Sequence, residues 1–101
     1  MARSVTIQYI DDCPNVPIVR SRLHEAAHAA GADISLVEEK VETIADAEQL
    51  GFTGSPTVLV DGVDPFARPG TSPAVACRVY ATPSGLSGAP TVDQLVDVLR
   101  N

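Results

Sequence analysis

The beginning of the chain changes its hydrophobic period twice, and this limits the possible folds more than any other feature. Apolar and polar residues alternate over residues 4–10, which is the period of a strand. Over residues 16–30 the apolar residues recur at helical spacing until Gly31, and a second short strand pattern covers residues 33–39. Because strand, helix and strand in succession form a right-handed crossover, the two strands are predicted to lie parallel in one sheet.

The later elements are shorter and are separated by Gly and Pro. Capping-box-like pairs at Thr43 and Thr91 begin two further helices. Two compact β-rich runs, residues 57–60 and 75–81, are predicted to pair antiparallel. The predicted fold class is α/β, with the order β-α-β-α-β-β-α and a four-stranded mixed sheet that carries helices on both faces.

Length and charge narrow the possible functions. The chain has 101 residues, which is enough for one domain with one core, so we expect a single domain over residues 1–101. Its net charge of -6 and its seven Lys and Arg residues argue against nucleic-acid and anionic-membrane partners. No apolar run approaches the roughly 20 residues of a membrane span, and residues 1–4 do not resemble a signal peptide. The expected location is the cytoplasm.

Cys13 is the first candidate functional residue. It stands just past the first predicted strand and at the amino end of the first predicted helix. The unpaired N–H groups and the dipole at a helix start favour a thiolate, which is the reactive form of cysteine. Asp11 and Asp12 oppose this, because nearby negative charge disfavours ionisation of a thiol. Cys13 is therefore the candidate nucleophile, with Pro14 and Asn15 as candidate substrate contacts.

A proline immediately before a predicted strand marks a second candidate segment, Ser55-Pro56-Thr57. A proline in this position can adopt the cis form and leave the preceding backbone N–H and C=O free to hold an extended substrate. Ser55, Pro56 and Thr57 are therefore candidate substrate-binding residues.

Together, the cysteine-proline turn after residues 5–12 and the proline segment of residues 50–62 resemble the thioredoxin superfamily in its small glutaredoxin-like form. The later stretch, residues 64–80, resembles small actinobacterial members, some of which carry an alkylmercury-lyase name. The resemblance implies a thioredoxin-like fold over nearly the whole chain. It also implies action on thiols or disulfides through Cys13, with no cofactor.

The resemblance has one clear departure at Val16. In the superfamily a resolving cysteine usually follows the nucleophile three residues later, and Val16 occupies that place here. A monothiol mechanism that uses a small thiol, such as glutathione or mycothiol, is what remains. The implied partner is a small thiol or a disulfide-bearing protein.

Cys77 is the other cysteine, and it alternates with Val75 and Val79 in the predicted strand. The simplest interpretation is a thiol buried in the core as a small hydrophobe. The alternative is a distant resolving thiol or soft-metal ligand. The predicted topology opposes a disulfide with Cys13, because Cys77 would begin the last strand several residues from the end that approaches Cys13.

Two other interpretations stay open. A binding module without catalysis would use the long Pro- and Gly-rich loop of residues 61–74 to contact a partner. A zinc hydrolase would use His24, Glu25 and His28, which match the two-histidine helical motif. These three residues lie beside the apolar stripe of their helix, so a solvated helix face is the simpler interpretation, and no metal site is predicted.

Overall fold

The computed structural model describes residues 2–101 and contains three helices and five strands. None of these helices is long and apolar enough to cross a membrane. The elements in chain order are β1 (Arg3–Tyr9), α1 (Val16–Ala30), β2 (Ile34–Lys40), α2 (Ile44–Leu50), β3 (Thr57–Val60), β4 (Tyr80–Thr82), β5 (Gly85–Ser87) and α3 (Val92–Arg100).

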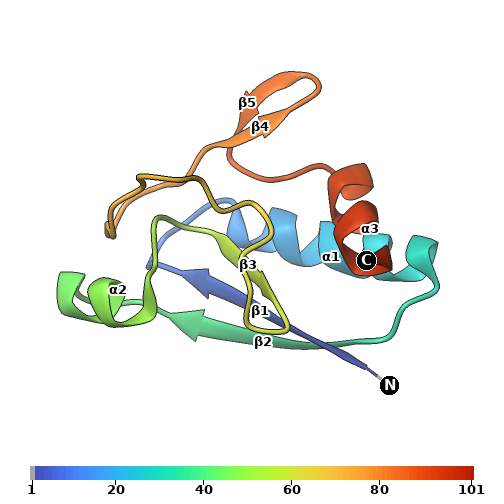
Figure 1. The fold of residues 1–101 in the computed structure, drawn as a ribbon, viewed down its shortest axis with the longest axis horizontal. Coiled ribbons are helices and arrows are strands. Elements are labelled where there is room, and N and C mark those ends of the chain that lie inside the picture. The colour runs from blue at the N-terminus through green and yellow to red at the C-terminus, as the bar shows by residue number, and fades with distance from the viewer. Residues whose placement is uncertain (1) are drawn as a thin grey trace.

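The main sheet has the strand order β2-β1-β3 (Figure 1). Strand β2 runs parallel to β1, as the crossover rule predicts, and β3 runs antiparallel to β1 on its other side. Val5 pairs with Val60 and Ile7 pairs with Val58, so these side chains share one face of the sheet. Helices α1 and α3 pack against each other and cover this face, which forms the main core.

The helix ends follow the capping residues in the sequence. Helix α1 ends where Gly31 adopts φ 64 and its N–H bonds back to the last turn, a conformation that suits glycine. The Thr43 side chain accepts a hydrogen bond from the Asp46 N–H at the start of α2. At the start of α3, Thr91 and Gln94 form a complete capping box. Helix α2 contributes to a second, smaller cluster of Val41, Ala47 and Phe52 at the end of the sheet.

The prediction of a four-stranded sheet is wrong. Only the end of the 75–81 run forms a strand, β4, and it pairs with β5 in a separate two-stranded sheet. This hairpin projects from the rest of the molecule in Figure 1. The backbone of residues 75–79 pairs with the main sheet region at one isolated bridge, between Ser55 and Cys77, and the Arg78 side chain donates to the Thr57 hydroxyl at 3.2 Å.

The expected alternation is present only at the end of the 75–80 run, where Arg78 and Tyr80 face inward in place of Cys77 and Val79, while Ala76 is exposed. Val75 and Val79 are 40% and 50% exposed, and Cys77 is exposed as well. The Tyr80 side chain is buried, and the Arg78 side chain is only 9% exposed. Because a strand pattern has a period of two, the choice between its two faces depends on which set finds partners inside. Here the inward set finds an ion pair and hydrogen-bond partners.

Leu23 tests the contact between α1 and the rest of the main core. Its side chain is fully buried. Leu23→Ala should lower the free energy of unfolding by about 2–5 kcal/mol, because it removes buried methyl groups and leaves a cavity. Leu86 on β5 is 74% exposed, so Leu86→Ala is the matched control and should change stability by less than about 0.5 kcal/mol. Equal losses in urea unfolding would contradict this description of the core.

Candidate functional site

Cys13 lies between the end of β1 and the start of α1, as the sequence predicts. The turn that leads to it places Asp12 at φ 59, and the Cys13 carbonyl accepts a hydrogen bond from the Val16 N–H at 3.5 Å. The first turn of α1 has no side-chain cap and no acidic residue. Pro17 has no N–H and the Val16 N–H is engaged by Cys13, so what favours an anion at this end is the positive end of the helix dipole. The Cys13 side chain is only 9% exposed and packs in the main core.

The Ser55–Thr57 segment lies beside the loop that carries Cys13. The Ser55–Pro56 peptide bond is cis, and all three side chains of the segment are buried. The Ser55 hydroxyl accepts a hydrogen bond from the Ile10 N–H at 3.2 Å. Because Ile10 precedes Cys13 by three residues, this bond ties the two candidate segments together.

The other two candidate residues differ in their surroundings. Pro14 is exposed, and Asn15 is half-buried against the backbone of Gly88. A Cβ atom at Gly88 would lie 2.3 Å from the Asn15 amide nitrogen, so a larger residue there would force the Asn15 side chain to move. The Asn15 side chain is therefore packed against the chain that leads to α3.

The backbone groups of Ser55, which the sequence suggested would be free for a substrate, are engaged by the chain itself. The Ser55 N–H donates to the Ala76 carbonyl at 2.8 Å, and the Ser55 carbonyl accepts from the Arg78 N–H at 2.8 Å. A further bond joins the Ala74 N–H to the Phe52 carbonyl at 3.1 Å. We call residues 74–79 the strap. Each of its backbone bonds contributes about 1 kcal/mol net, so the bridge at Ser55 is a modest contact.

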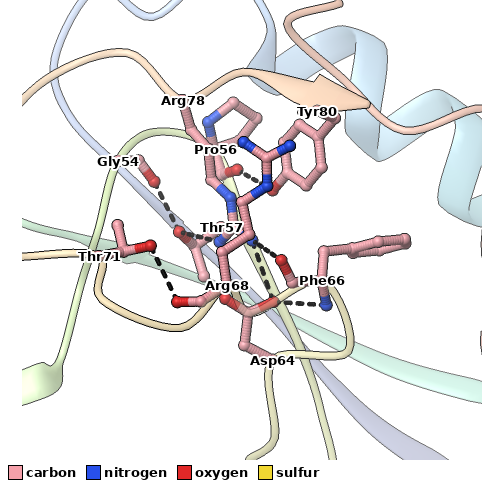
Figure 2. A network of polar contacts seen from close by, with 9 residues as sticks. All are labelled: Gly54, Pro56, Thr57, Asp64, Phe66, Arg68, Thr71, Arg78 and Tyr80. Atoms are coloured by element: carbon pink, nitrogen blue, oxygen red, sulfur yellow. Dashed lines mark hydrogen bonds and ion pairs between the residues drawn. The ribbon is translucent and has the colours of Figure 1, made fainter. Parts of the chain in front are cut away.

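Arg78 anchors the strap through a network that the sequence did not reveal (Figure 2). Its guanidinium forms an ion pair with Asp64 at 2.6 Å and donates to the Phe66 carbonyl at 2.7 Å. The same group lies 4.7 Å from the centre of the Tyr80 ring, which Phe66 contacts edge-on. The side chains of Arg78 and Asp64 are 9% and 18% exposed, so the pair is largely desolvated.

Tyr80 connects this network to the proline segment. Its hydroxyl donates a hydrogen bond to the Pro56 carbonyl (Figure 2). Burial raises the pKa of Tyr80 well above its ordinary value. The cation of Arg78 opposes this rise in pKa, whereas the negative charge of Asp64, and that of Cys13 when it is ionised, add to it. Tyr80 therefore stays protonated and keeps its donor role at neutral pH.

The prediction that Cys77 is a buried core thiol is wrong, because Cys77 is exposed. It borders a small hollow of about 200 Å³, which is below the usual size of a small-molecule site. The hollow is lined by Thr53, Arg68, Thr71, Cys77, Arg78 and Val79.

The zinc motif lies on solvent-exposed helix surface. His24, Glu25 and His28 are all exposed on α1. Among residues 2–101, no group of three or more His, Cys, Asp or Glu side chains is arranged to hold a metal ion. A solvated helix face accounts for this pattern.

Comparison with known proteins gives no further guide to function. No family model, no curated protein and no solved structure matches the chain.

Arg78→Met tests the anchor of the strap. The substitution leaves the Asp64 carboxylate without its cation in a largely desolvated place, so the free energy of unfolding should fall by about 3 kcal/mol. Arg20→Met is the matched control, because Arg20 also holds a carboxylate, that of Glu38, with two hydrogen bonds but at the surface. Its loss in urea unfolding should be much smaller. Equal losses for the two variants would contradict the anchoring role.

Because burial raises the pKa of Tyr80, we expect the folded protein to lose stability at high pH. A raised folded-state pKa means that the contribution of this group is fully present below its unfolded-state pKa of about 10 and is lost as the pH rises toward the folded-state value. In Tyr9→Phe protein, Tyr80 is the sole tyrosine. Its phenolate absorbance should appear at higher pH in folded protein than in urea-unfolded protein. The same titration midpoint in both states would show that Tyr80 is not buried as described.

Proposed function

We propose that this chain is a thioredoxin-like protein that acts on disulfides through Cys13 as its single nucleophilic cysteine. The observation that carries the proposal is the hydrogen bond from the Ile10 N–H to the Ser55 hydroxyl, because it joins the thiol loop to the proline segment. The order β2-β1-β3, with β1 and β2 parallel, is compatible with the resemblance in the sequence. A cytoplasmic location belongs to this proposal, because reduced thiols persist there.

The local chemistry favours a nucleophile at Cys13. Cys13 lies at the amino end of α1, where the positive end of the helix dipole favours an anion and no acidic side chain stands in the first turn. In the proposed reaction, the Cys13 thiolate attacks one sulfur of a disulfide. A new S–S bond forms to Cys13 while the old S–S bond breaks, and the departing sulfur takes the electron pair and leaves as a thiolate. In a monothiol cycle, an external thiol then attacks the mixed disulfide and releases Cys13.

Burial of the thiol sets the condition for this reaction. Cys13 is 9% exposed, and the backbone groups beside it at Ser55 are held by Ala76 and Arg78. A disulfide substrate reaches the sulfur only when this covering opens locally. Openings of this kind cost less than global unfolding when the covering contacts are few.

A test of the proposal uses Cys77→Ser protein, in which Cys13 is the sole cysteine. Folded protein should form a Cys13 adduct with glutathione disulfide, and mass spectrometry measures its rate of formation. The control protein carries both Cys13→Ser and Cys77→Ser and should remain unmodified. If the adduct forms only after urea unfolding, Cys13 has no function as a thiol in the native protein.

The same covering of Cys13 favours a second candidate, a binding module without catalysis. Its contact surface would be the loop of residues 61–74, most of which is exposed. In that case Cys13→Ser protein would retain all partner capture in a pull-down, and the native Cys77→Ser protein would form no glutathione adduct. The thiol proposal requires the adduct, so the adduct measurement separates the two functions.

A further inference from the structure

We propose that Cys77 is the second thiol of the Cys13 reaction, presented by the strap to resolve the mixed disulfide into a Cys13–Cys77 disulfide. This inference rests on the proposed function, since it requires Cys13 to react first. It replaces the external resolving thiol of a monothiol cycle with a residue of the same chain. Val16 occupies the usual place of a resolving cysteine, so the second thiol has to come from elsewhere in the fold.

The strap places Cys77 directly across from Ser55. The two residues form an isolated parallel bridge through the bonds of Ser55 to Ala76 and Arg78. Paired backbones lie about 5 Å apart, so the Cys77 backbone lies against the proline segment. The sequence-based objection placed Cys77 at the start of a sheet strand far from Cys13. The bridge instead places Cys77 opposite Ser55, in the proline segment.

Two contacts bring this region to the loop of Cys13. The Ser55 hydroxyl holds the Ile10 N–H, so the residue opposite Cys77 is bonded to the chain just before Cys13. Val75, which precedes Cys77 by two residues, lines a hollow together with Ile10 and Asp11. The strap therefore approaches the thiol loop at the bridge and at Val75 before it.

The strap is held at Ser55 by few contacts, and the proposed reaction requires it to open there. Both thiols are free, with Cys13 buried and Cys77 exposed, so the sulfurs meet only after the strap shifts. The bridge at Ser55 consists of two backbone hydrogen bonds, and residues 75–77 are exposed. Arg78 holds the next residue in its buried ion pair, so Cys77 stays tethered near the site while its own backbone is released. A tethered thiol acts at a high effective concentration compared with a thiol in solution.

The proposed reaction consists of two thiol–disulfide exchange steps. The Cys13 thiolate attacks a low-molecular-weight disulfide, forms a mixed disulfide and expels one thiolate. The Cys77 thiolate then attacks the Cys13 sulfur, which breaks the mixed disulfide and expels the second thiolate. Overall, the small disulfide is reduced to two thiols, and the Cys13 and Cys77 thiols are oxidised to one protein disulfide.

The experiment follows both cysteines after addition of glutathione disulfide to reduced protein. Samples are quenched with acid and digested with trypsin without reduction. Cys13 then lies in peptide 4–20 and Cys77 in peptide 41–78, because Arg68 precedes a proline and is not cleaved. Wild-type protein should yield these two peptides joined by a disulfide, at the intact mass of a monomer. Its Cys13–glutathione adduct should disappear about tenfold faster, or more, than the adduct in Cys77→Ser protein. Cys13→Ser protein should yield no joined peptides.

The outcomes separate the inference from the function on which it rests. Equal lifetimes of the Cys13 adduct in wild-type and Cys77→Ser proteins, without joined peptides, would overturn the role of Cys77 and leave Cys13 as a monothiol. Joined peptides found only at the mass of a dimer would overturn the intramolecular step in the same way. Absence of any Cys13 adduct in native Cys77→Ser protein would instead overturn the proposed function.

Discussion

The buried ion pair of Arg78 with Asp64 determines how the second half of this molecule is arranged. A guanidinium that is 9% exposed requires a partner, and Asp64 supplies it together with the Phe66 carbonyl. Once Arg78 faces inward, its neighbours in the alternating run face outward, which exposes Cys77 and Val79. The same choice directs Tyr80 toward the Pro56 carbonyl. The strap, its bridge to Ser55 and the separate hairpin therefore share one electrostatic origin.

This arrangement gives the candidate site its character. The loop that carries Cys13 is joined to the proline segment at the end of β1 by the bond from Ile10 to Ser55, and the strap occupies the backbone groups of Ser55. The Cys13 thiol is buried, so it requires a local opening before it can act on a substrate. In our proposal the covering segment also supplies the second sulfur. The feature that closes the site then takes part in its chemistry.

The sequence predicted well the parts of the fold that local pattern decides. The residues of α1 were predicted as 16–30, and the structure has the same bounds, because a buried stripe and a glycine stop lie within the segment itself. The crossover rule likewise gave the parallel pairing of β1 and β2. The prediction for residues 75–81 was wrong because an alternating pattern allows either of its two sets of side chains to face inward. The face is selected by Asp64, a charge 14 residues away that no local pattern reveals. The bonds of the Ser55 backbone to Ala76 and Arg78 depend on the same contact between residues far apart in the sequence. The sequence therefore predicted where the candidate segments lie, but not that the strap covers them.

The most direct test of the strap's position is to detect the hydrogen bond from the Arg78 N–H to the Ser55 carbonyl in solution. Nuclear magnetic resonance detects scalar coupling across a hydrogen bond, here from the Arg78 amide nitrogen to the Ser55 carbonyl carbon. The strap as described predicts a measurable coupling, together with slow amide hydrogen exchange at Arg78. Absence of the coupling, with rapid exchange at Arg78, would show that the strap does not occupy the proline segment.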